Sequence, residues 1–359
     1  MKPPPLIPNP DEEADEEGPR SIYDTDPPDE EDLWFLPPAD DEDPEVFLPS
    51  MPRPDQPMLF DPRDWRMAQS ELAAELADLA VTFGALDERL RAGPRGWGHR
   101  LALMEVSDLG WWTGDRISVD RLALWTGLRI GATSDDVQAL YRAGWAVRRL
   151  SSGAEPSEGG WEAGLTAFLD RQAQGFEDAT EAVIDLAEVM GNLAGLHPVT
   201  QAAVGFHAWR ALSPGIGQDT EAAIIAARHA AGMGRKGALF MPLSLSGPGA
   251  LRGAGTVAEK LAAWIRGAGQ ASLAALLHLE RINAWEKRAR EATSGLSGRT
   301  PPVLIDVLAA WPMVSAPLAE ELTQASRAAV QRNLDRFSRR GLIREVTGQG
   351  RYRVWTAAL

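Results

Sequence analysis

Arginine side chains recur near the C-terminus at spacings that fit one face of a helix. Between residues 327 and 340, Val330, Leu334 and Phe337 are four and three residues apart, which places them on one apolar stripe. The side chains left for the other face are mostly basic, namely Arg327, Ala328, Gln331, Arg332, Asp335, Arg336 and Arg339. Guanidinium and amide groups on such a face can hydrogen-bond to the base edges and phosphates of duplex DNA.

The residues around this helix predict a winged helix-turn-helix over 303–359. Pro312 ends a first apolar helix because proline has no amide hydrogen to donate, and Ser315 and Ser326 can cap two further helices. The expected elements are helices over 303–311, about 316–322 and 327–340, followed by a β-hairpin wing with strands over 342–346 and 351–355 around the turn 347–350.

In such a domain the start of the third helix meets base edges, and cations further along it and on the wing meet phosphates. We predict base contacts from Arg327, Ala328 and Gln331. Phosphate contacts are predicted from Arg332, Arg336, Arg351 and Arg353. Winged helices also serve as protein-binding or structural appendages, so a protein-interaction adaptor stays open as an alternative.

The net charge of −15 is concentrated at the opposite end of the chain. Residues 1–60 hold 18 acidic and 3 basic side chains, whereas residues 299–359 hold 9 basic and 5 acidic ones. The predicted DNA-binding domain is therefore locally positive, and the local field governs binding more than the total charge does.

The first 60 residues also hold 15 of the 26 prolines, and this composition predicts a disordered acidic tail. Two apolar segments within it, 33–37 and 46–49, could dock into the groove of a protein partner, or the tail could only aid solubility. A third hypothesis is that the tail folds back on the basic domain and competes with DNA.

Composition limits the remaining classes of function. The 359 residues include no cysteine and no run of eighteen apolar residues, and the acidic, proline-rich start does not look like a signal peptide. We expect a cytoplasmic protein that requires no membrane, no disulfide and no cofactor. The five histidines form no cluster with metal-ligand spacing, so no metal site is predicted.

Alanine-rich helical patterns predict a mainly α domain over 66–293, joined to the winged helix by a linker at 294–302. The predicted helices cover about 72–92, 119–126, 135–150, 161–190, 200–212, 221–233, 257–266 and 270–292. The last of them is long enough to pair across a two-fold axis, so a homodimer is one expectation.

Three segments together resemble a proteobacterial family of unknown function that joins a Fic-like helical domain to a C-terminal winged helix. They are LDERL at 86–90, LHLERINAWEKRA at 277–289 and TGQGRYRVW at 347–355. The resemblance covers about residues 66–359 and implies a multi-helix Fic-like fold for 66–293.

Fic enzymes transfer a nucleotide phosphoryl moiety to a protein hydroxyl, and the resemblance implies that this activity is lost here. In the best match to the Fic motif, Ser213 replaces the catalytic histidine and Glu221 replaces the phosphate-binding arginine. Thr113 stands where the inhibitory helix of such proteins carries glutamate. We therefore predict no catalytic residues and no enzyme activity.

Two other motifs have structural explanations. His197-Pro198 is followed by no glycine nest, and the glycine-rich segment 247–255 leads into a capping box of Thr256 and Glu259 instead of following a strand. The favoured interpretation is a DNA-binding regulator with a degenerate Fic-like domain; a nucleotide-binding or transferase-type enzyme is the alternative.

Overall fold

The computed structural model describes residues 60–128, 136–170, 176–213, 215, 217–348 and 352–359. The elements below belong to the compact unit formed by residues 57–359. The predicted tail lies outside the described residues, except for Phe60. Among the residues that are described, no helix combines the length and apolar character needed to cross a membrane.

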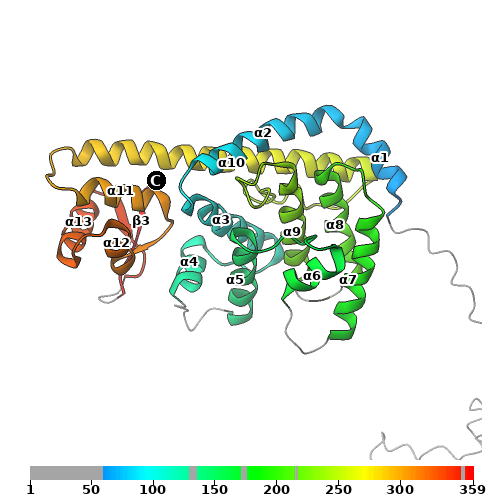
Figure 1. The fold of residues 1–359 in the computed structure, drawn as a ribbon, viewed down its shortest axis with the longest axis horizontal. Helices are drawn as coiled ribbons and strands as arrows, with labels where there is room; N and C mark the ends of the chain where they lie inside the picture. The colour runs from blue at the N-terminus through cyan, green and yellow to red at the C-terminus, as the bar shows by residue number, and fades with distance from the viewer. Residues whose placement is uncertain (1–59, 129–135, 171–175, 214, 216, 349–351) are drawn as a thin grey trace, which may run out of the picture. The chain divides into compact units, whose positions relative to one another are not determined.

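The fold is mainly α with one small sheet (Figure 1), as predicted. The helices are α1 (Pro62–Glu71), α2 (Ala73–Ala92), α3 (Gly96–Thr113), α4 (Val119–Leu128), α5 (Val137–Ser151), α6 (Trp161–Leu169), α7 (Phe176–Gly191), α8 (Pro198–Leu212), α9 (Gln218–Ala230), the 3-10 helix η2 (Ala231–Met233), α10 (Val257–Thr293), α11 (Thr300–Ala310), α12 (Ala316–Thr323) and α13 (Arg327–Arg339). The strands are β1 (Val314–Ser315), β2 (Ile343–Glu345) and β3 (Val354–Ala357).

Helix α10 is one continuous helix of 37 residues, so the prediction of two helices with a break after residue 266 was wrong. The predicted capping box at its start is confirmed, with Thr256 and Glu259 each accepting from the other's backbone amide. Gly267 does not break the helix. It lets the segment around Ala250 approach closely, because a Cβ atom on Gly267 would lie 2.2 Å from the Ala250 nitrogen.

The helix expected over 72–92 is confirmed as α2, and the residues before it form the separate helix α1. One other predicted helix is interrupted. The helix expected over 161–190 ends at Leu169, where Asp170 takes a left-handed conformation with φ of 50°, and α7 starts at Phe176. Apolar periodicity continues across this interruption, which is why spacing alone did not locate it.

Helices α8 and α9 lie side by side, and α10 packs against α1, α2 and α8 before it reaches α11 (Figure 1). Large aromatic side chains such as Phe206, Trp209 and Trp264 are fully buried between these helices. Each buries on the order of 150–250 Å² of surface, so they supply much of the apolar stabilisation of the helical part.

The C-terminal helices are fixed to the helical part by buried side chains of α3. The Arg100 guanidinium donates to the carbonyl oxygens of Leu308 (3.2 Å) and Trp311 (2.6 Å) at the end of α11. The Trp97 indole donates to the Ala309 carbonyl at 3.1 Å. A cation at the negative end of a helix is favourable, so these bonds cap α11. Helix α11 begins at Thr300, three residues before the helix start expected at residue 303.

A second charged group, Glu105 of α3, is buried without a cation beside it. Its Oε1 accepts from the backbone amides of Leu243 and Ser244 at 2.8 and 2.9 Å, while its Oε2 has no hydrogen-bond partner among the described residues. Burial raises the pKa of Glu105 from 4.5 to about 7. The folded protein therefore holds a proton on this carboxyl at pH values where the unfolded chain has already lost it.

We expect this group to make stability depend on pH. Between about pH 4.5 and 7 the folded state binds the extra proton, so the free energy of unfolding contributed by Glu105 falls as the pH rises, by about 3 kcal/mol in total. Glu105→Gln removes this titration while keeping the shape of the side chain. Urea unfolding should be measured for both proteins from pH 4 to 8. As the pH rises, the free energy of unfolding of the variant should increase relative to that of the unmodified protein. A constant difference would mean that Glu105 titrates normally.

Candidate nucleic-acid interface

The last sixty residues form three helices and a three-stranded sheet in the chain order α11, β1, α12, α13, β2, β3. The sheet order is β1-β3-β2 with antiparallel neighbours, and Ile343 pairs with Ala357 while Val314 pairs with Trp355. Both predicted caps are confirmed, since Ser315 Oγ accepts from the Leu318 amide at 3.3 Å and Ser326 Oγ from the Ala329 amide at 3.4 Å. Between the two helices Gln324 turns the chain with φ of 52°.

The sheet differs in detail from the prediction. The return strand β3 covers Val354–Ala357 instead of 351–355, and the short strand β1 was not predicted. Two residues give too little alternation to be recognised as a strand in sequence, and β1 exists because β3 offers it a pairing edge.

The apolar face of α13 is the predicted one. Val330, Leu334 and Phe337 are all 0% exposed. The structure adds Asn333 to this buried side, where its Nδ2 donates to the Ala329 carbonyl at 2.8 Å. Packing of this stripe fixes which side of α13 faces outward.

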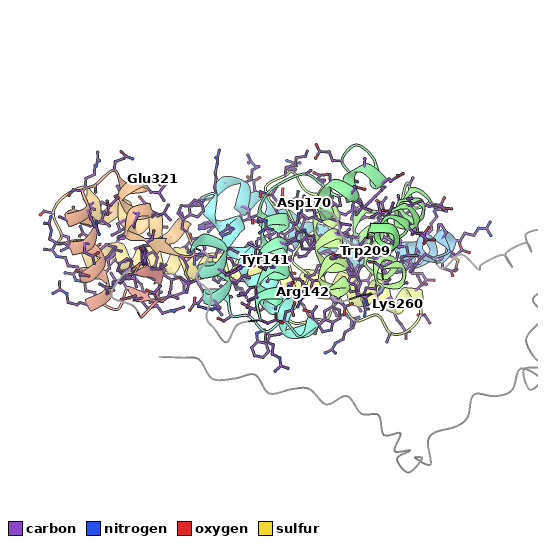
Figure 2. All side chains as sticks on the ribbon, turned by 90° about the horizontal axis from the view of Figure 1, so that it is seen from below. Tyr141, Arg142, Asp170, Trp209, Lys260 and Glu321 are labelled. Carbon is purple, nitrogen blue, oxygen red and sulfur yellow. The ribbon has the colours of Figure 1, made fainter. Side chains whose placement is uncertain are left out.

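The outward face carries most of the predicted contacts. Arg327, Ala328, Arg332 and Arg336 are exposed. Within the part of the chain that the structure describes, no carboxylate pairs with any of these three arginines. Their charge is uncompensated by direct partners and is free to attract an anion. Glu321 of α12, in the same domain, is labelled in Figure 2.

Two of the other residues predicted to contact DNA are bound to carboxylates of the same domain. The Gln331 amide donates to Asp335 Oδ1 at 2.9 Å on its own helix. Arg353 is bound to Glu345 at 2.7 Å, lies 3.7 Å from Asp335, and stacks over Trp355. The hydrogen bond with Glu345 raises the pKa of Arg353. Arg353 can meet a phosphate only while sharing its charge with these carboxylates, and Arg351 lies outside the described residues.

Two basic residues near the sheet are engaged with the helical part. Arg344 of β2 forms an ion pair with Asp120 of α4 at 2.6 Å, and Arg340 donates to the Ala292 carbonyl of α10. Sequence reasoning could not separate these arginines from those of α13, because only the packing of the domain on α4 and α10 gives them partners.

The positions taken from the Fic motif extend from the end of α8 into the first turn of α9. Ser213 is the C-cap of α8, and Glu221 of α9 accepts from the indole of Trp209 (labelled in Figure 2) at 3.1 Å. Beside them, Arg210 pairs with Asp219 at 2.5 Å. The acidic groups of this segment therefore take part in the contacts between α8 and α9.

The other two motifs have structural roles. His197 is the N-cap of α8, and its Nδ1 accepts from the Val199 amide at 3.2 Å. The glycine-rich segment leads into the Thr256 cap of α10 and packs through Ala250 on Gly267. These contacts account for both motifs without a ligand.

The C-terminal residues match a known protein family, whereas no curated protein matches the chain. Residues 301–357 match the family described as an HTH DNA binding domain, and this segment contains α12, α13 and the paired strands described above. The C-terminal residues are therefore similar to helix-turn-helix domains that bind DNA, which supports a DNA-binding protein.

Proposed function

We propose that the protein binds duplex DNA through α13 and regulates transcription. The observation that carries this proposal is the row of exposed arginines on α13, none of them paired with a carboxylate of the described residues, within a segment similar to HTH DNA binding domains. Arg327, Ala328 and Gln331 contact bases, and Arg332 and Arg336 contact phosphates.

The β2–β3 hairpin acts as a wing in this proposal. Arg351 and Arg353 supply its phosphate contacts. Arg353 gives up part of its interaction with Glu345 when it binds the phosphate. The helical domain is a Fic-like scaffold without catalytic function, and the protein acts in the cytoplasm without a cofactor.

Exposed leucines on α10 support a homodimer. Leu273 and Leu277 lie one turn apart on this helix and are 52% and 56% exposed. Side chains four residues apart share one face of a helix, so these two can meet their counterparts across a two-fold axis. A dimer would present two copies of α13 to paired half-sites.

DNA binding itself is tested by measuring the affinity for duplex DNA across a salt series. With four arginines at phosphates, the plot of log K against log salt should have a slope of about −3 to −4. A random-sequence duplex measures nonspecific affinity, and a duplex from the promoter of the protein's own gene measures specific affinity. No binding by the full chain at low salt would make the domain a protein-interaction module.

The acidic tail is expected to weaken this binding. Residues 1–60 carry a net charge of −15 that can compete with DNA for the basic domain, so a protein of residues 61–359 should bind DNA more tightly at low salt. This gain in affinity should disappear at high salt, because salt screens the attraction of the basic domain both to the tail and to DNA. Equal affinity of the two proteins at low salt would leave the tail free to dock a protein partner or to act only in solubility.

A further inference from the structure

A cavity of about 700 Å³ lies within the helical part, against the end of α11. It is lined by the end of α2, the start of α3, Thr126 of α4, the end of α5, the segment 236–240 and Trp311. Its volume is in the range typical of small-molecule sites. Neither the DNA contacts nor the predicted Fic motif uses any of these residues.

The charged side chains that line the cavity are all positive. Arg91, Arg95, Arg148 and Lys236 line it, and no carboxylate does. Arg91 is held by Glu88 at 2.6 Å. Arg95, Arg148 and Lys236 have no carboxylate partner among the residues placed by the structure, so three cations are left to face the cavity without compensation.

The backbone of Lys236 is held in place at this rim. Its backbone has φ of 64°, a left-handed conformation that is uncommon for residues other than glycine. The buried Asp87 carboxylate keeps the turn in place by accepting from the Arg235 and Ala238 amides at 2.8 and 2.7 Å. The neighbouring Gly237 could not be replaced, because a Cβ there would lie 2.0 Å from the Asp87 carbonyl oxygen.

The wall of the cavity is apolar with a few hydrogen-bonding groups. Val147, Leu150, Phe240 and Trp311 give it an aliphatic and aromatic surface. His99 lines it beside Ser151, with 3.4 Å between His99 Nδ1 and Ser151 Oγ. Apolar walls with a small number of polar groups are typical of sites for organic ligands.

We propose that this cavity binds an organic phosphate with an apolar body, the phosphate held by Arg95, Arg148 and Lys236 and the body packed against Phe240 and Trp311. A phosphate monoester carries a charge of about −1.5 to −2 at pH 7 and three acceptor oxygens, which matches three unpaired cations better than a single carboxylate does. The site is separate from the DNA contacts and does not depend on them.

Isothermal titration calorimetry of the full chain with 1-naphthyl phosphate tests this site, with 1-naphthoate, 1-naphthol and inorganic phosphate as companion probes. We expect saturable binding of one naphthyl phosphate per chain, at least tenfold weaker binding of naphthol, and intermediate affinity for naphthoate. Arg148→Gln combined with Lys236→Gln should weaken naphthyl phosphate at least tenfold. The matched control is Lys287→Gln with Arg288→Gln, two exposed cations on α10 outside the cavity, which should leave the affinity unchanged.

Both exchanges remove the same charge at exposed positions, so the melting temperatures without ligand should be similar and loss of binding will not reflect unfolding. The proposal is overturned if naphthyl phosphate does not bind saturably at millimolar concentration, or if the two double variants bind it equally. Equal affinity for naphthol and naphthyl phosphate would also overturn it, since the cations would then have no role.

Discussion

Arg327→Glu combined with Arg332→Glu is expected to abolish DNA binding, with affinity reduced at least about 100-fold at low salt. Loss of a base-contacting arginine costs about 1–3 kcal/mol, loss of a phosphate contact weakens binding to all sequences, and a carboxylate in either place repels the DNA. Both side chains are exposed on α13, away from its buried stripe, so the fold should tolerate the change. Fluorescence anisotropy with a labelled duplex across a salt series measures both the affinity and its salt slope.

A control must separate the loss of this face from the change in net charge. Lys287→Glu with Arg288→Glu changes the total charge by the same amount at exposed positions on α10. It should reduce affinity only a few-fold and leave the salt slope near that of the unmodified protein. If both variants lose affinity equally, long-range charge governs binding, and if the α13 variant keeps it, the interface lies on another surface.

Trp285→Ala should be the most destabilising single exchange at the junction of α10 with the C-terminal domain, lowering the free energy of unfolding by about 3–5 kcal/mol. Trp285 is 1% exposed, and its indole nitrogen donates to the Leu342 carbonyl at 2.7 Å, just before β2. Truncation leaves a cavity and removes one of the two hydrogen bonds that the Leu342 carbonyl accepts, the other coming from the Ala358 amide at 3.0 Å. Denaturant unfolding followed by circular dichroism measures the change.

Trp285→Phe divides this effect into its parts. It keeps most of the packing and loses the hydrogen bond, so a decrease of about 1–2 kcal/mol is expected. Leu277→Ala, at an exposed position of the same helix, serves as the baseline and should change stability by less than about 0.5 kcal/mol in the monomer. A Trp285→Ala effect as small as that of Leu277→Ala would show that the domain does not depend on this contact.

Local chemistry made much of the C-terminal domain predictable. Ser315 and Ser326 cap helices because a serine oxygen next to unpaired amides is favourable in almost any context, and the spacing of Val330, Leu334 and Phe337 admits only one buried face. The exposure of Arg327, Arg332 and Arg336 follows from that spacing. These parts depend on neighbours within a few residues along the chain.

The unpredicted features depend on partners distant in sequence or on close packing. The pair of Arg353 with Glu345 and Asp335 forms only when the hairpin closes over α13. Arg344 finds Asp120 more than two hundred residues away. The continuity of α10 through Gly267 depends on the segment around Ala250 packing against that glycine, which no periodicity reveals. The helical cavity likewise joins side chains from α2, α3, α4 and α5 with the segment 236–240 and Trp311.

The unbroken length of α10 has a consequence for how two copies could address one DNA site. At about 1.5 Å per residue, its 37 residues span roughly 55 Å, and its far end is fastened to the C-terminal domain through Trp285 and Ala292. In a dimer joined along α10, the length of this rigid helix would fix the distance between the two α13 helices. DNA sites with different half-site spacings would then be bound with different affinities because of this fixed distance, independently of the base contacts.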